Sequence, residues 1–164
     1  MAVYDTFTQA LASDERGQPA ASFDALRALA DALFGVKVFT VQTHDHATGV
    51  ANRLYSTVPD VYPVGGLKPA DETFWSRLVI DEQKTFVAND LTEIAAVFPD
   101  YGQIEQLDCA SIINIPVVIG GKVWGTINCL HEEGHWTPAR IAASEQLKLP
   151  GAACFLLERA SDAP

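Results

Sequence analysis

The residues best suited to nucleophilic or redox chemistry in this chain are its three cysteines, Cys109, Cys129 and Cys154. A thiol nucleophile needs a base within hydrogen-bond reach, which the fold would have to supply. An odd number of cysteines at wide spacing does not indicate a disulfide framework. The sequence therefore predicts three small, buried, apolar thiols in a reducing, cytoplasmic setting.

Histidines occur in two clusters with the spacing of metal ligands. The segment His131–His135 reads HEEGH and matches the HExxH pattern of zinc proteases, whose chemistry requires both histidines on one helix. Here the motif contains Gly134 and precedes Pro138, so a turn is the better interpretation. The pair His44 and His46 also falls in an expected turn. We therefore predict no metal site and no cofactor.

A third motif, Gly65-Gly66-Leu67-Lys68, has a superficial likeness to a phosphate-binding loop. It lacks the spacing of a P-loop, and Pro69 follows the lysine directly. We therefore expect a turn that carries a solvated Lys68.

Two predicted hairpins provide the framework for these residues. Residues 36–43 alternate and are rich in β-branched side chains, and residues 52–56 return after a turn at 44–49. Residues 111–119 and 122–130 form a second pair around Gly120-Gly121, a dipeptide that suits a type I′ turn. Hairpins imply an antiparallel sheet.

Apolar residues at helical spacing predict a helix near each end of the chain and one after the first. Ser22 is the expected N-cap of the second helix, and Gly35 its end. Thr137 is the expected N-cap of the last helix, which Pro150-Gly151 is expected to kink. The three helices are predicted at residues 2–12, about 23–33 and 138–159.

The middle of the chain is an irregular crossover, residues 57–84, rich in proline and glycine. Residues 71–80 have helical spacing, and residues 84–88 form a short strand. Residues 89–108 are expected to form two short helices separated at Pro99.

Together these elements predict an α+β domain of three layers over residues 1–164, with an N-terminal helix and linker (1–20) and a core (21–160). A central antiparallel sheet of five to six strands has the terminal helices on one face and the crossover with its short helices on the other. A ligand would occupy a cavity between the crossover and the sheet.

The register of the second hairpin decides which polar side chains share a face. A ladder without a bulge pairs Ala110 with His131, so Ser111 and Ile113 share a face with Asn128. Asn114 then lies on the opposite face, unless a bulge intervenes. A buried asparagine needs partners, which are either local groups or the polar edge of a ligand.

Composition excludes several classes of partner. Apolar residues make up 48% and charged residues 20% of a chain with net charge −10. Lysine and arginine form no cluster that could bind phosphate groups, so we predict no binding to nucleic acid or to an anionic membrane. No secretory signal or apolar run of membrane-spanning length is present. The acidic total gives a faint bias against anionic ligands.

The order of elements resembles the GAF domain family, with the residues SIINIPVVIGGKVWGTIN (111–128) similar to its central hairpin. The resemblance covers about residues 23–157 and implies a small-molecule-sensing, non-catalytic module. Arg53–Ser56 and Tyr62–Lys68 look like small bacterial GAF proteins that act alone. The terminal helices are then expected to form a homodimer surface.

If a pocket exists, aromatic and polar side chains around the crossover and central strands would line it. Phe98 and Asp100 belong to this set in addition to the principal candidates. The candidate ligand-binding residues are Phe39, Tyr55, Tyr62, Trp75, Phe86, Asp90, Tyr101, Cys109, Ser111, Ile113 and Asn128.

Two alternatives to ligand sensing stay open. One GAF branch reduces free methionine sulfoxide with loop cysteines, and Cys109 lies near but out of register with such a position. The same register places Cys109 and His131 on opposite faces, which argues against this reductase. The other alternative is an interaction module with a filled core.

Overall fold

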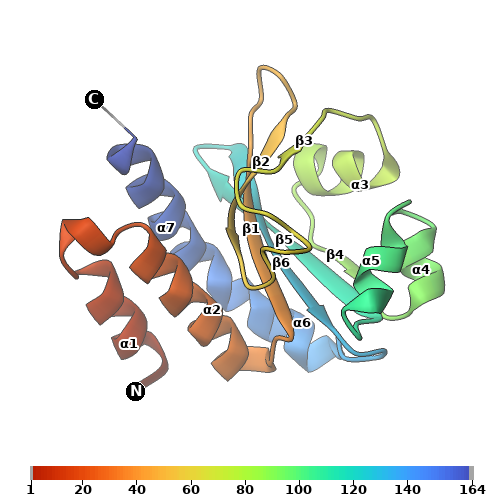
Figure 1. The fold of residues 1–164 in the computed structure, drawn as a ribbon, viewed down its shortest axis with the longest axis horizontal. Coiled ribbons are helices and arrows are strands. Elements are labelled where there is room, and N and C mark those ends of the chain that lie inside the picture. Colours follow the sequence, from red (N-terminus) through yellow and green to blue (C-terminus); the bar gives the residue numbers. More distant parts are fainter. Residues whose placement is uncertain (1, 163–164) are drawn as a thin grey trace.

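A computed structural model describes residues 2–162 as a six-stranded antiparallel sheet between two layers of helices (Figure 1). The terminal helices α1, α2, α6 and α7 lie on one side of the sheet, and α3, α4 and α5 lie on the other. The predicted α+β, three-layer architecture is confirmed. Within residues 2–162, every helix is too short or too polar to cross a membrane.

The strands are ordered β3-β2-β1-β6-β5-β4, so the two long hairpins meet at the centre. Each neighbouring pair is antiparallel. The strands are β1 (Val38–His44), β2 (Ala51–Ser56), β3 (Leu67–Lys68), β4 (Phe86–Ala88), β5 (Ser111–Ile119) and β6 (Lys122–His131).

The β5–β6 turn forms as predicted, with positive φ at both Gly120 and Gly121. A bulge between Val117 and Val118 then shifts the register by one residue. Asn114 therefore pairs directly with Asn128. The prediction that these two asparagines serve opposite faces is wrong, because it assumed a ladder without a bulge.

The helix layer consists of α1 (Ala2–Leu11), a short 3₁₀ turn η1 (Glu15–Gly17), α2 (Ala20–Phe34), α6 (Pro138–Ser144), η3 (Glu145–Leu147) and α7 (Lys148–Ser161). Thr137 caps α6 as expected. Helix α2 starts before Ser22, whose hydroxyl instead donates to Gln18 Oε1. The final helix is interrupted at η3 rather than at Pro150-Gly151, because a proline in the first turn of α7 loses no helical hydrogen bond.

The crossover layer consists of α3 (Phe74–Ser76), a π-helical turn η2 (Arg77–Asp81), α4 (Leu91–Ala95) and α5 (Tyr101–Gln106). The expected helix over 71–80 is shorter, because Thr73 caps it with its side chain and reciprocates with Ser76. The two short helices on either side of Pro99 are confirmed.

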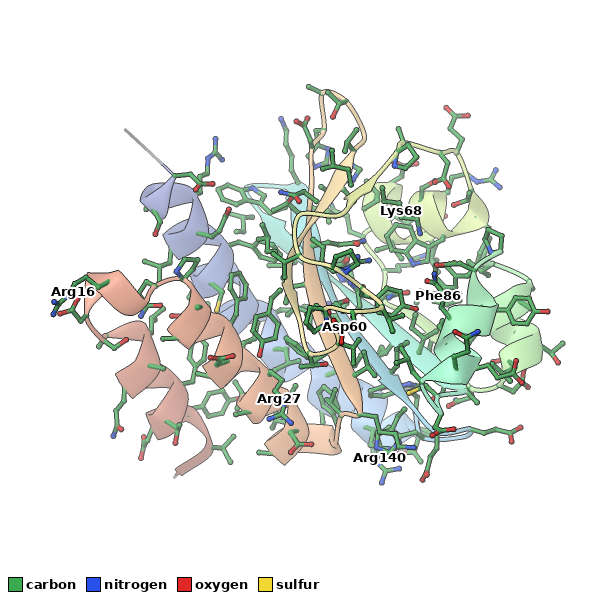
Figure 2. All side chains as sticks on the ribbon, in the orientation of Figure 1. Arg16, Arg27, Asp60, Lys68, Phe86 and Arg140 are labelled. Carbon is green, nitrogen blue, oxygen red and sulfur yellow. The ribbon has the colours of Figure 1, made fainter. Side chains whose placement is uncertain are left out.

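Each face of the sheet has its own apolar core. The larger core, under the terminal helices, includes Phe39, Ile113 and Ile127, all fully buried. The smaller core, under the crossover, includes Phe86 and Cys109. Figure 2 shows Phe86 and Lys68 on the crossover side, and Arg16 and Arg27 on the terminal helices. Between the smaller core and the sheet edge lies the cavity described next.

Candidate ligand-binding cavity

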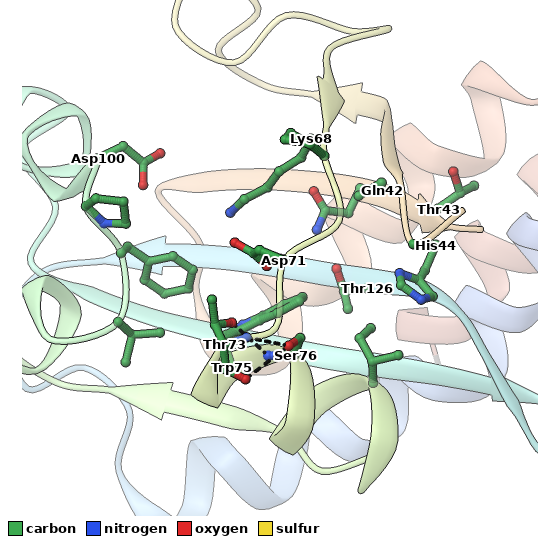
Figure 3. A pocket seen from close by; sticks show the side chains of 17 residues that line it. Gln42, Thr43, His44, Lys68, Asp71, Thr73, Trp75, Ser76, Asp100 and Thr126 are labelled. Atoms are coloured by element: carbon green, nitrogen blue, oxygen red, sulfur yellow. Dashed lines mark hydrogen bonds between the residues drawn. The ribbon is translucent and has the colours of Figure 1, made fainter. Parts of the chain in front are cut away.

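A cavity of about 310 Å³ lies between the crossover and the face of the sheet away from the terminal helices. A smaller chamber of about 80 Å³ adjoins it along the central strands. Both chambers are lined by the same five residues, Gln42, Lys68, Trp75, Phe98 and Asp100. The two chambers therefore form one site, and Figure 3 shows the residues that line the larger chamber.

The floor of the smaller chamber is a chain of side-chain hydrogen bonds. Trp75 Nε1 donates to Asn114 Oδ1 at 2.9 Å, and Asn114 Nδ2 donates to Asn128 Oδ1 at 2.7 Å. Asn128 Nδ2 then donates to Thr40 Oγ1 at 3.3 Å. This chain leaves the Thr40 hydroxyl proton without a partner among the described residues.

Strand pairing explains why these polar groups are in line. Thr40 lies opposite Asn128 in the β1–β6 ladder, and Asn128 lies opposite Asn114 in the β5–β6 ladder. Two residues along β6, Thr126 faces the same cavity from a position only 1% exposed. Its hydroxyl has no hydrogen-bond partner among the described residues. A buried polar atom without a partner favours a bound polar molecule or water at that point.

Aromatic rings form the wall opposite the floor. Trp75 lines both chambers and is fixed by its bond to Asn114 and by the capping box at Thr73. Phe98 packs edge-on against Phe86, with ring centroids 5.8 Å apart, and so carries the smaller core up to the cavity. Flat rings above a polar floor suit a small planar or partly apolar ligand.

Four charged side chains line the site, Arg53, Lys68, Asp71 and Asp100. Figure 3 shows Lys68 and Asp71 entering from one stretch of the crossover and Asp100 from another segment, with Lys68 extended toward the Asp100 side. None of the four takes part in an ion pair among the described residues. Lys68 is thus not merely a solvated loop lysine: its Nζ lies 5.4 Å from the centre of the Phe98 ring.

The structure brings Tyr62, Trp75 and Asn128 together in the cavity, along with Phe98 and Asp100. The remaining eight candidates lie elsewhere: Phe39, Tyr55, Phe86, Asp90, Tyr101, Cys109, Ser111 and Ile113. Which residues contact a ligand stays a prediction.

Alternation on the strands explains the first group that lies elsewhere. Phe39 and Ile113 belong to the core under the terminal helices. Ser111 lies two residues before Ile113 on β5 and therefore on the same face of the sheet. Tyr55 packs against Phe39 and Phe23, and its hydroxyl donates to Asp24 at 2.7 Å. Burial, followed by that hydrogen bond, raises the pKa of Tyr55 to about 12.

The other four have structural roles in the crossover layer. Phe86 and Cys109 are buried in the smaller core, and Asp90 caps α4 by accepting from Glu93 N. Tyr101 begins α5 and is 41% exposed. Their positions fix the walls of the cavity without lining it.

None of the cysteines has the surroundings of a nucleophile. Cys109 is 2% exposed, and its Sγ donates to Leu107 O at 3.5 Å. Burial raises the pKa of the Cys109 thiol, and it does the same for Cys129 and Cys154. All three thiols are free, and they are divided between the two cores. A raised pKa disfavours the reactive thiolate.

The HEEGH segment is a turn, as predicted, since β6 ends at His131 and the next helix starts at Pro138. The rings of His131 and His135 stack with centroids 3.5 Å apart. His135 Nε2 lies 2.8 Å from Phe34 O. Among residues 2–162, no group of three or more His, Cys, Asp or Glu side chains is placed to hold a metal ion.

Sequence reasoning missed most of the polar floor and both cations. Thr40, Gln42, Thr126 and Arg53 were not singled out, and Asn114 was assigned to the other face. Alternation along β1 was the available signal, because Thr40 and Gln42 alternate with the buried apolar residues Phe39 and Val41.

The fold and the cavity define a small α+β domain that encloses a site between a sheet and its crossover. The family model for the GAF domain matches residues 19–147, and the chain belongs to this family of small-molecule-binding sensory domains. No curated protein matches it significantly.

Solved GAF domains share the fold at low sequence identity. One from a phosphoenolpyruvate-protein phosphotransferase of Coxiella burnetii has a TM-score of 0.71 and 17% identity, covering 99% of this chain and 95% of that chain. One from a two-component sensor histidine kinase of Bacillus halodurans has a TM-score of 0.65 and 18% identity, with 85% and 95% covered. The PixJ GAF domain of Thermosynechococcus elongatus has a TM-score of 0.62 and 16% identity, with 89% and 88% covered.

Proposed function

We propose that this chain binds a small molecule reversibly and non-covalently in the cavity between its crossover and its sheet, without chemically changing it. The supporting observation is the cavity floor, where the central strands carry a hydrogen-bonded polar chain and the unpartnered Thr126 hydroxyl. Central strands of a buried sheet normally carry apolar side chains on both faces, so this polar face favours recognition.

Catalysis receives no support from the geometry. A thiol-dependent reductase would need an accessible thiolate, and Cys109 is buried with its pKa raised by that burial. The ligand is therefore expected to leave unchanged, and the signal to be conformational.

The crossover is the part of the molecule that we expect ligand binding to order. Residues 57–84 supply Tyr62, Lys68 and Trp75 to the site. Their described backbone bonds to the sheet are few: the β2–β3 pairing, the bonds of Gly65 and Gly66 to Arg53, and that of Thr57 N to Phe39 O. A segment with so few backbone bonds to the rest of the fold opens at low free-energy cost. Ligand contacts would shift this segment toward its closed state.

We also propose that two copies associate through the terminal helices, in the cytoplasm. These helices expose Val3, Tyr4, Leu149 and Leu156, and Leu149 is 81% exposed. Sedimentation equilibrium tests the dimer: a mass that rises toward twice 17.7 kDa with concentration supports it. A mass that stays at the monomer value contradicts it.

The ligand proposal is tested by thermal unfolding in the presence of the small-molecule fraction of a bacterial cell extract. A ligand that binds only the folded state raises the melting temperature. Ala51 lines the cavity, so Ala51→Phe fills it and should abolish the shift. Ala142→Phe on the exposed surface of α6 is the matched control and should retain it. An equal shift in both variants would place binding elsewhere.

A further inference from the structure

Arg53 carries a partly buried positive charge that lacks an anionic partner. It lies on β2 and lines the smaller chamber. Its Nη1 donates to Pro63 O at 3.3 Å, and its guanidinium lies 4.9 Å from the centre of the Tyr62 ring. Its Nε is buried with no hydrogen-bond partner among the described residues. Loss of hydration lowers the pKa of Arg53, opposed by Tyr62 and Asp100.

Leaving a guanidinium donor buried without an acceptor is costly, and most such groups in proteins are paired. All ion pairs among the described residues lie elsewhere, at Arg16–Asp14, Lys84–Glu82 and Lys148–Glu145. The Nε–H of Arg53 is therefore a donor for which the described residues provide no acceptor.

Lys68 adds a second cation to the same site. It is on β3, which pairs with β2, and it lines both chambers. Its ammonium is held near the Phe98 ring rather than by a carboxylate. Two cations from neighbouring strands thus approach one cavity, and a guanidinium with an ammonium is a common setting for a carboxylate.

Of the four charged residues of the site, three are exposed, Lys68 among them. Asp71 and Asp100 are exposed, on segments that border the larger chamber, whereas Arg53 is partly buried. Solvent screens exposed charges more effectively than buried ones. The charge of Arg53, in the smaller chamber that Lys68 and Asp100 also line, is therefore the least screened of the four, despite the net charge of −10.

We propose that the ligand is a small organic carboxylate without a positive charge, whose carboxyl oxygens accept from the Arg53 guanidinium and Lys68 Nζ. Its flat or apolar part would lie against Trp75 and Phe98. This inference rests on the proposed function and adds the chemical class of the ligand. It reverses the faint bias against anions that the total charge suggested.

The test is calorimetric titration of the full chain with matched probes that differ only in charge. Three skeletons are used, phenyl, indolyl and unbranched six-carbon, each as the carboxylate, the α-amino acid and the amine. We expect at least one carboxylate to bind ten-fold or more tightly than its amino acid, and no amine to bind. Tighter binding of an amino acid or amine, or binding of no carboxylate, overturns the proposal.

Variants of the charged residues test where the ligand binds and which charge it carries. Arg53→Gln should weaken the best carboxylate at least ten-fold, and Arg53→Lys should restore part of it. Because Arg53 also holds the loop at Pro63, Lys68→Gln provides a second test at an exposed position and should weaken binding several-fold. Lys84→Gln, an exposed lysine paired with Glu82 away from the cavity, is the control and should change nothing.

The variant Asp100→Asn tests whether the ligand is an anion or a zwitterion. Removing that carboxylate should tighten the binding of an anion, but it should weaken a ligand whose ammonium group uses Asp100. Failure of the carboxylates alone leaves the proposed function standing if the extract still raises the melting temperature of the wild type and not of Ala51→Phe. Failure of both experiments removes the proposed function as well.

Discussion

The two faces of the central sheet are built from the same strands and yet differ in kind. On the face toward the terminal helices, Phe39, Val41, Ile113 and Ile127 are fully buried and apolar. On the other face, Thr40, Asn114 and Asn128 form a polar stretch beside the apolar residues Val38, Ile112 and Leu130, and a cavity lies above it. The first face is packed for stability. The second gives up apolar burial where a ligand could use hydrogen bonds, which is the pattern expected of a binding site.

Adjacent residues on β5 provide the strongest test of this contrast. Ile113→Ala removes a fully buried side chain and should cost about 2–5 kcal/mol of unfolding free energy. Asn114→Ala leaves Trp75 Nε1 and Asn128 Oδ1 without partners beside a cavity that water can enter. Its cost should be nearer 1 kcal/mol.

Denaturant unfolding of Ile113→Ala and Asn114→Ala measures the two losses of unfolding free energy. Equal losses would mean that the polar face is a structural core in its own right, and the contrast between the faces would fail.

Two glycines probe the available space on each side. A Cβ at Gly125 would meet Gln42 O and lie 2.6 Å from the Phe155 ring, so the helix side of the sheet has no space for a methyl group there. Gly125→Ala should destabilise the fold by about 3 kcal/mol. Gly102 lies in α5 with no atom within 4 Å of an added Cβ, so Gly102→Ala should be neutral or stabilising by about 0.5–1 kcal/mol. Melting curves that show a loss at Gly102 as large as that at Gly125 would contradict this picture.

The reactivity of the three cysteine thiols tests how tightly both cores are packed. Cys109, Cys129 and Cys154 are all buried with raised pKa values, so alkylation at pH 8 should be more than about 100-fold slower than in denaturant. Mass spectrometry of a timed reaction with iodoacetamide measures this. Fast modification of Cys109 alone would revive the reductase alternative.

The stacked histidines predict a small dependence of stability on pH. Burial first, and then the mutual charge of the pair, lowers the pKa of His131; burial also lowers the pKa of His135. Because the folded state binds these protons less readily, stability is full above the usual pKa of 6.5 and falls as the pH drops below it.

The expected loss between pH 7 and pH 5 from this pair is less than about 1 kcal/mol. His131→Gln, which removes one ring of the stack, should reduce it. If unfolding measurements show the same or a steeper acid dependence in that variant, the histidine pair does not cause it.

The fold could be predicted from sequence because its signals are local. Alternation defined the strands, Gly120-Gly121 defined the turn, and Thr137 defined the start of α6. The site could not be predicted as well, because it depends on register. One bulge between Val117 and Val118 brings Asn114 opposite Asn128, and no residue type in this segment predicts the bulge.

The aromatic candidates show a second limit of sequence reasoning. Phe39 and Tyr55 have the same chemistry as Tyr62 and Trp75, but the first two pack under the terminal helices. Which face a strand residue takes is set by the sheet as a whole, whereas the two cavity aromatics come from the crossover. Counting aromatic residues near the crossover therefore overestimated the site.

The most direct test of the account is native mass spectrometry of the wild type, Asn114→Ala and Ile113→Val, each incubated with the same small-molecule extract. A mass increment that vanishes on denaturation should be present in the wild type and in Ile113→Val, and absent or much reduced in Asn114→Ala. An increment retained equally by all three, or found in none, would contradict the assignment of the ligand to the polar face.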